Sequence, residues 1–264
     1  MRFVPLVAAF AFLVASCTGT EPIDTSTTIT SSTTTTTQAS DTPACLSGEL
    51  PFVEEGTVAA LDSPGRDARA IAGIRWDPLE GCERVEIEFL SASGAPATRI
   101  GPVGVSMLSD AGIVRVTLSD DVVDSAVADS TLNGTLVDRW FVVEDSEDGL
   151  TIDLHLNERA AARAFTTTSP ARLVIDLRGT GDDLPLAKPL SDGGVVLLSP
   201  QAGVGLYPLQ VAGYAAPDVD AVRLRLTDSA EISIDRAVST LSTTHVWRAY
   251  SAALSDGPSG SVLL

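Results

Sequence analysis

The sequence predicts an all-β protein with two antiparallel β-sandwich domains, and three observations lead to this prediction. In segments such as Arg84–Phe89, apolar and charged residues alternate with the period of two that a half-buried strand requires. Turn signals such as Asn133–Gly134 separate these segments, and long helical periodicities are absent. Thr, Val and Gly are plentiful, whereas aromatic residues make up only 5% of the chain, which favours small β domains.

Length and charge limit the classes of protein that fit. The 264 residues, 44% of them hydrophobic, can bury one or two ordinary cores. The formal net charge of -18 argues against a nucleic acid partner, because neutralising phosphates requires clustered Lys and Arg. The acidic balance is compatible with a divalent cation or a basic partner, although it favours a surface that simply keeps the protein soluble.

The N-terminus has the pattern of a secretion signal in residues 1–16. Arg2 precedes an apolar run, Phe3–Ala15, that is too short to span a bilayer. The run ends in Val-Ala-Ser-Cys, which resembles the bacterial lipobox, in which the cysteine is lipidated on sulfur and becomes the mature N-terminus. The alternative is an ordinary signal peptide followed by an incidental cysteine. We expect an extracytoplasmic protein anchored through Cys17 to the outer face of the cell membrane.

Residues 17–43 combine the predicted lipidated cysteine with a stretch made almost entirely of Ser and Thr. This composition offers too little apolar surface to offset the entropy of ordering the chain, so it predicts a disordered tether. The dense hydroxyl groups are equally compatible with O-glycosylation.

Cys45 and Cys82 are the two remaining cysteines. Because an exported protein meets an oxidising compartment, the simplest prediction is a disulfide between them. Such a bond closes a loop of about 37 residues and contributes roughly 3–4 kcal/mol in the chain-entropy model. A metal site at these residues is disfavoured, since neither histidine is near them in sequence and there is no CxxC motif.

The first domain is predicted to cover residues 44–180. Its expected strands are 84–89, 113–118, 140–143, 151–156, 163–168 and 172–177. A tight turn is predicted at Asn133–Gly134 and another at Asp148–Gly149. In 151–156 the alternation places three aliphatic side chains inward, so Asp153 and His155 are expected to point outward.

The residue types and their spacing along this domain follow the pattern of a known family. The matching residues are Gly81, Arg84, Val85, Glu88, Phe89, Trp140, Phe141, Val143, Gly149, Leu150, Thr151, Phe165, Pro170, Arg172, Leu173, Val174, Ile175 and Asp176. Through these residues the domain resembles the AMIN-like domain of actinobacterial envelope lipoproteins. The resemblance implies a non-catalytic sandwich that localises envelope proteins, often by contacting peptidoglycan. Cys82 departs from the pattern, because a bulky apolar residue is expected after the glycine; the predicted disulfide is therefore a feature of this chain.

Residues 181–191 predict a linker, because Pro185 and Pro189 interrupt a polar stretch. A second β domain is predicted over 192–264, with strands at 195–198, 209–213, 221–226, 231–235, 246–253 and 261–264. A second set of residues in this part also matches a known family: Ser199, Pro200, Gly203, Pro208, Val211, Gly213, Ala215, Leu226, Asp228, Trp247 and Tyr250. Through them this part resembles the immunoglobulin-like domain of bacterial spore germination proteins. The resemblance implies that Trp247 fills the space between two sheets.

A search for reactive residues finds little. His155 and His245 are poorly placed for a catalytic triad, and GxSxG, HExxH and P-loop motifs are absent. The acidic groups Asp120–Asp121–Asp124 and Glu144–Asp145–Glu147–Asp148 could form a glycosidase pair or bind Ca²⁺, but solvated charge is favoured. If the ligand is a sugar, Trp76 and Arg139 are candidates, although both are also compatible with core or rim packing.

These observations predict a non-enzymatic envelope protein that binds or scaffolds peptidoglycan or an envelope protein, with no cofactor, no metal and no catalytic residue. The chief alternative is a cell-wall hydrolase that uses paired carboxylates. A sporulation or germination role is suggested only by the resemblance of the second domain. A transporter substrate-binding protein is disfavoured, because it would need two α/β lobes and no βα alternation is visible.

Overall fold

The computed structural model describes residues 45–62, 65–145, 149–181, 186, 188–201, 204–205, 208–227, 233–240, 244–254 and 262–263. The predicted signal peptide, Cys17 and the tether up to residue 43 lie outside the described residues. Apart from the short 3-10 turn Ser109–Ala111, the described part of the chain is built from strands and the loops between them, which confirms the all-β prediction. Within it, no helix is long and apolar enough to cross a membrane.

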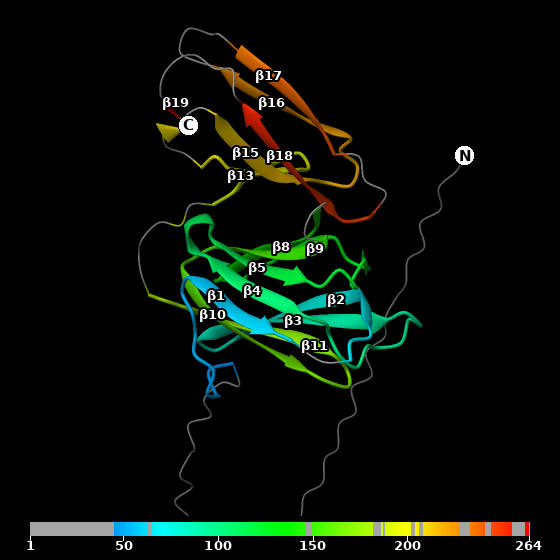
Figure 1. Ribbon diagram of the computed structural model, residues 1–264. Helices are drawn as coiled ribbons and strands as arrows, with labels where there is room; N and C mark the ends of the chain where they lie inside the picture. The colour runs from blue at the N-terminus through cyan, green and yellow to red at the C-terminus, as the bar shows by residue number, and fades with distance from the viewer. Residues whose placement is uncertain are drawn as a thin grey trace, which may run out of the picture. The chain divides into compact units, whose positions relative to one another are not determined.

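Two facing sheets enclose the main core (Figure 1). The first sheet begins with β1 (Gly56–Leu61), β4 (Val103–Leu108), β5 (Ile113–Leu118), β9 (Gly149–Leu156) and β8 (Val137–Asp145), with β7 (Asp129–Thr131) also pairing with β8. The second sheet contains β10 (Ala160–Thr167), β11 (Arg172–Gly179), β3 (Cys82–Ser91), β2 (Ala68–Leu79) and β6 (Asp124–Ser125). The predicted antiparallel pairing holds between nearly all of these neighbours, the exception being β2 with β6.

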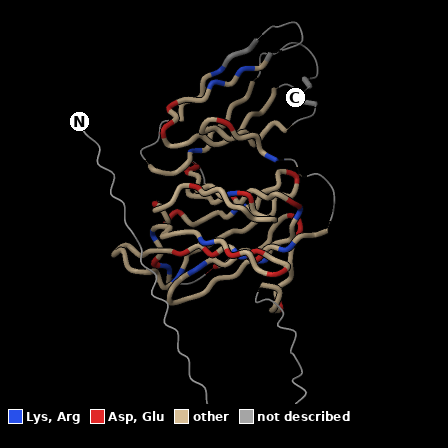
Figure 2. The backbone as a smooth tube through the Cα atoms, turned by 180° about the vertical axis from the view of Figure 1, so that it is seen from behind, with Lys and Arg blue, Asp and Glu red and all other residues tan. Residues whose placement is uncertain are grey.

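The alternation read from the sequence sets the core. Val85, Ile87 and Phe89 of β3 are all buried and face Ile152 and Leu154 of β9 across one hydrophobic cluster. The charged residues between them in β3 form the opposite face of the sheet. Acidic and basic positions are interspersed along these strands (Figure 2). Burial of one face of each sheet is therefore the force that fixes the strand register.

Two short segments cross between the sheets and close the sides of the sandwich. Val53 pairs with Ala162 of β10, and the chain then enters β1, which pairs with β4. On the other side, β6 runs parallel to β2 before β7 pairs with β8. The crossings give the outer strands of both sheets hydrogen-bonding partners, which limits edge-to-edge association.

The C-terminal strands extend the first sheet. β18 (Trp247–Leu254) runs parallel to β8, with Trp247 opposite Val143, and the sheet continues through β15 (Leu209–Ala215), β13 (Val195–Ser199) and β12 (Leu190–Asp192). Two hairpin-like pairs complete the set: β16 (Ala221–Thr227) with β17 (Ser233–Ser239), and β14 (Val204–Gly205) with β19 (Val262–Leu263). A second hydrophobic cluster lies among these strands, formed by Leu209, Val211, Ala215, Val222, Tyr250 and Leu254.

The structure corrects two predictions about side-chain position. Asp153 and His155 do not face solvent: their exposed fractions are 0% and 6%. Their side of β9 is covered, since Tyr214 of β15 bonds to Asp153 and its ring lies near that of His155. Trp247 is buried as predicted, but it packs edge-on against Phe141 of β8, with ring centroids 4.7 Å apart, and not in the second cluster.

Several predicted strands and turns occur where they were expected but differ from the prediction in their bounds. The hairpin around residue 133 exists between β7 and β8, but five residues separate the strands where we predicted a two-residue turn. Gly134 has no positive φ; it is needed because a Cβ there would lie 2.3 Å from the carbonyl oxygen of Val137. Part of the predicted linker, from Leu190, belongs to β12, and β17 continues to Ser239, four residues beyond its predicted end.

Candidate functional site

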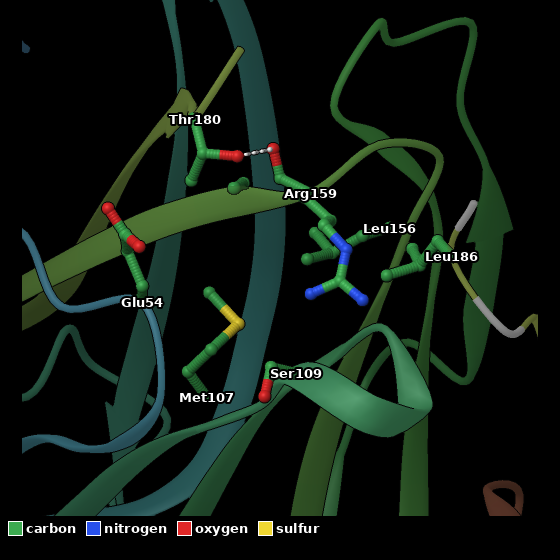
Figure 3. Close-up of a pocket in the computed structure, with 8 residues that line it drawn as sticks. Glu54, Met107, Ser109, Leu156, Arg159, Thr180 and Leu186 are labelled. Atoms are coloured by element: carbon green, nitrogen blue, oxygen red, sulfur yellow. Dashed lines mark hydrogen bonds between the residues drawn. The ribbon is translucent and has the colours of Figure 1, made fainter. Parts of the chain in front are cut away.

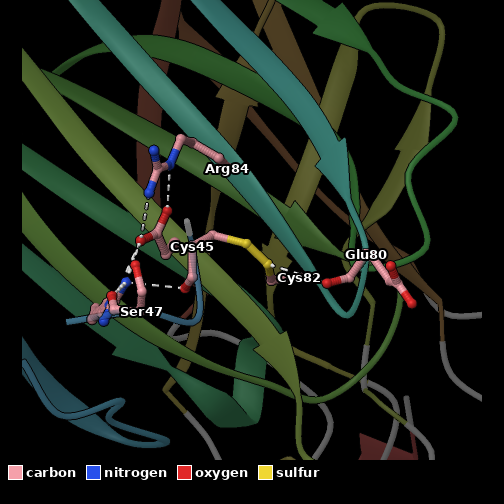
Figure 4. Close-up of a disulfide and its surroundings, with 7 residues drawn as sticks. Cys45, Ser47, Glu80, Cys82 and Arg84 are labelled. Carbon is pink, nitrogen blue, oxygen red and sulfur yellow. Dashed lines mark hydrogen bonds and ion pairs between the residues drawn. A yellow bond between two sulfur atoms is a disulfide. The ribbon is translucent and has the colours of Figure 1, made fainter. Parts of the chain in front are cut away.

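A disulfide joins Cys45 to Cys82, as predicted (Figure 4). It ties the segment that precedes β1 to the first residue of β3, and both cysteines are buried. The two cysteines have a sequence separation of 37, so the bond removes considerable conformational freedom from the unfolded chain. The bond fixes the entry of the chain into the fold.

A buried charge network lies beside this disulfide. Asp176 of β11 is fully buried and accepts hydrogen bonds from Arg84 Nε at 2.7 Å and from Arg163 Nη2 at 3.0 Å. The same Arg163 nitrogen donates to the carbonyl oxygens of Cys45 and Ser47. A buried carboxylate with two cationic partners is well compensated. This network therefore holds the N-terminal segment onto β10 and β11.

A second buried carboxylate lies on the covered side of β9. Asp153 accepts two hydrogen bonds from Arg115, at 2.8 and 2.7 Å, and one from the hydroxyl of Tyr214. Burial raises the pKa of Asp153, while the ion pair with Arg115 opposes that shift. Burial, aided by the positive charges of Arg139 and Arg115, lowers the pKa of His155 to about 4, so this imidazole is neutral at pH 7. These groups serve the packing of the sheet.

The structure brings together two acidic groups that are far apart in sequence. Asp120, in the turn after β5, and Glu144 and Asp145, at the end of β8, line one surface hollow of about 290 Å³. We call it the acidic hollow; its other lining residues are Val122, Val123, Gly149 and Leu150. Arg248 lies 3.6 Å from Glu144, and Thr244 donates a hydrogen bond to it. Glu147 and Asp148 lie outside the described residues.

The other acids of the first predicted group do not line the hollow. Asp121 pairs with Arg66 and Arg69, and Asp124 accepts a hydrogen bond from the backbone of the next residue. A glycosidase needs one carboxyl with a raised pKa in an apolar cleft, opposite a second, ionised one. In the hollow, Glu144 already has a cationic partner in Arg248. The hollow therefore places three carboxylates at one surface position, one of them paired with Arg248.

The candidates for sugar binding are engaged within the fold. Trp76 packs on the core and donates its indole N–H to Glu83. The carboxylate of Glu83 also accepts the backbone N–H groups of Leu136 and Val137, at the start of β8. Arg139 lies 5.3 Å from the ring of Phe141 and donates to Thr131 and Ser191. His245 is exposed just before β18. None of these side chains is presented as an open sugar platform.

Sequence reasoning missed a small pocket at one end of the sandwich (Figure 3). We call it the arginine pocket; it is lined by Glu54, Met107, Ser109, Leu156, Arg159, Ala160, Thr180 and Leu186. These residues come from five separate segments of the chain, so no local motif identifies the pocket. Leu186, from the predicted linker, packs on Gly112, where a Cβ would lie only 2.5 Å from its Cδ2 atom.

Among the described residues, no three His, Cys, Asp or Glu side chains are grouped so that they could hold a metal ion. Comparison with known proteins adds no further constraint: no family model, curated protein or solved structure matches the chain.

Proposed function

We propose that the chain is an exported lipoprotein, in which Cys17 carries the lipid and residues 17–43 tether a folded module to the outer face of the cell membrane. The observation that carries the proposal is the Cys45–Cys82 disulfide, because stable disulfides belong mainly to oxidising, extracytoplasmic compartments. The N-terminal pattern, with Arg2 and an apolar run before Cys17, supports the same compartment.

We also propose that the folded part comprises an AMIN-like sandwich at 44–180 and an immunoglobulin-like domain at 192–264. In favour of this division, the residues that carry the first resemblance include core members of β3 and β11, such as Phe89 and Ile175. A separate hydrophobic cluster lies within residues 209–254. The shared sheet through β8 and β18 means that the two parts would be joined by backbone pairing as well as by the connecting chain.

The module would bind or scaffold an envelope component, either peptidoglycan or a protein, and not transform it. The bonding of three buried carboxylates supports this role. Asp176, Asp153 and Glu83 are each bonded to arginines, to ring hydroxyl or N–H groups, or to backbone N–H groups, and these bonds serve the fold. A catalytic carboxyl must instead be open to a substrate.

Co-sedimentation tests the binding role. The mature chain from residue 17, with Cys17→Ser so that it is soluble without lipid, would be mixed with purified peptidoglycan and, separately, with envelope extract. We expect it to pellet with one of the two, while an unrelated protein of similar negative charge stays in solution. Recovery of the whole chain in both supernatants would contradict the proposal.

The acidic hollow favours the second candidate, a cell-wall hydrolase, because it places Asp120 beside Glu144 and Asp145. Release of soluble fragments from purified peptidoglycan would be measured for the parent chain, for Asp120→Asn and for Asp121→Asn. Asp121 is the matched control, since it pairs with Arg66 and does not line the hollow. Cleavage that is lost only in Asp120→Asn would overturn the non-catalytic proposal.

A further inference from the structure

Among the residues that the structure describes, none accepts a hydrogen bond from the side chain of Arg159. Its guanidinium points into the arginine pocket (Figure 3), and among the described residues its side chain has no hydrogen bond or ion pair. Its Nε atom is buried and unbonded. In a chain with 35 acidic and 17 basic residues, a partly buried arginine readily finds a carboxylate partner. The lack of such a partner for Arg159 among the described residues therefore indicates that its guanidinium is available to a ligand. A buried donor left unbonded costs free energy that a ligand acceptor would recover.

We propose that the arginine pocket binds a carboxylate, namely the C-terminal carboxylate of a peptide. This inference rests on the proposed binding function and specifies the chemistry of its partner. The planar guanidinium presents parallel N–H donors that match the two oxygens of a carboxylate. Ser109 lines the pocket near Arg159 and offers a hydroxyl donor, whereas the hydroxyl of Thr180 is already bonded to the carbonyl oxygen of Arg159.

The size of the pocket fits this group. Its volume is about 40 Å³. One water needs on the order of 10–15 Å³ of such space, so the pocket holds roughly three water-sized groups, the number of heavy atoms in a carboxylate. Met107 and Leu156, both buried, form an apolar wall with Leu186. That wall lowers the local dielectric around the carboxylate.

Glu54 adds selectivity. It lines the same pocket, and Figure 3 shows it across Met107 from Arg159. Its negative charge repels a phosphate dianion more strongly than a carboxylate, which carries a single charge. Its oxygens can accept the backbone N–H of a terminal peptide residue. One cationic and one anionic wall therefore match a peptide end, which carries a carboxylate next to an amide N–H, better than a simple inorganic anion.

A titration followed by NMR tests the inference on the soluble chain with Cys17→Ser. The probes are acetyl-Ala-Ala with a free C-terminal carboxylate, the same dipeptide as its amide, sodium acetate and inorganic phosphate. We expect the free acid to bind at least about tenfold more tightly than the amide and than phosphate. Acetate equal to the dipeptide acid would assign the site to small organic acids and overturn the peptide assignment. Equal binding of acid and amide would overturn the carboxylate site itself.

Variants locate the binding. Arg159→Met should weaken binding of the dipeptide acid by about tenfold or more, whereas Arg223→Met, an exposed arginine on β16, should leave it unchanged. Thermal unfolding of both variants checks that the fold is retained, and Arg159→Lys, which keeps the charge without the fork, should restore binding only in part. Unchanged binding by folded Arg159→Met would refute the site. Co-sedimentation of that variant with envelope material distinguishes the two failures: if it persists, the proposed function stands without the pocket.

Discussion

The outward faces of β9 and β11 are alike in sequence but are buried by different parts of the chain. Each strand has an aspartate on the side that faces away from the main core, Asp153 in β9 and Asp176 in β11, and both are fully buried. On the β11 side, residues Cys45 and Ser47 of the N-terminal segment lie against the Asp176 network, where their carbonyl oxygens accept hydrogen bonds from Arg163. The C-terminal strand β15 covers Asp153.

The two carboxylates also differ in compensation. Asp176 has two arginine partners, Arg84 and Arg163, both from neighbouring strands. Asp153 has one arginine and one tyrosine hydroxyl, and burial raises its pKa. Asp176 is therefore held within the sheet that contains β3, β10 and β11, whereas Asp153 links β9 to the C-terminal strand β15.

The largest effect is expected from Asp176→Asn. Removing this charge leaves Arg163, whose side chain is only 5% exposed, buried without its counter-ion. The free energy of unfolding, measured with urea, should fall by about 3–5 kcal/mol. Glu88→Gln is the control, since Glu88 pairs with Arg172 at the surface and should contribute less than about 1 kcal/mol. Equal effects of the two variants would refute the structural role of Asp176.

Removal of the disulfide should come next. Cys45→Ser with Cys82→Ser should lower the free energy of unfolding by roughly 3–4 kcal/mol, because the unfolded chain regains the freedom of a 37-residue loop. The segment covering Asp176 should become sensitive to protease before the rest of the fold. Cys17→Ser should change neither property; loss of stability in that variant would contradict the assignment of Cys17 to the tether.

A fall in pH should lower the free energy of unfolding through His155 of β9. The folded-state pKa of His155 is lowered to about 4, so the unfolded state binds a proton first as the pH falls below 6.5. The stability that neutral His155 contributes is therefore fully present above pH 6.5 and is lost as the pH falls from 6.5 to about 4. The loss in free energy of unfolding is roughly 3 kcal/mol at most. The raised pKa of Asp153 acts in the opposite sense, with stability falling as the pH rises.

Comparison of variant and parent at each pH isolates the histidine. The difference in unfolding free energy between His155→Phe and the parent should shift in favour of the variant as the pH falls from 7 to 4.5. If the two proteins lose stability in parallel over that range, His155 is not the acid-sensitive group.

A smaller effect is expected from Tyr214→Phe, which removes the hydroxyl of β15 that donates a hydrogen bond to Asp153. The free energy of unfolding should fall by about 1–2 kcal/mol, since the hydroxyl's hydrogen bonds with Asp153 and with Arg115 are lost, while Asp153 and Arg115 still bond each other. A double-mutant cycle with Asp153→Asn measures the coupling between the two side chains. A coupling energy near zero would show that the link between β9 and β15 is made by ring packing alone.

The sequence predicted side-chain burial correctly in strands that have the core on one face and solvent on the other. The pattern of Val85, Ile87 and Phe89 in β3 predicted their burial correctly. The same rule was wrong for Asp153 and His155, because alternation identifies two faces and cannot reveal that distant chain covers the second. The disulfide was predictable from cysteine number and compartment. The arginine pocket was not, since Glu54, Ser109 and Arg159 meet only through the tertiary fold.

The most direct test of the central claim, that this is a module held outside the cell by lipid at Cys17, is the intact mass of the mature protein recovered from the membrane fraction. The account predicts a chain that begins at Cys17 and carries the added mass of acyl groups on that residue. A full-length chain beginning at Met1 in the cytosol, or a mature chain without acyl groups, would contradict it.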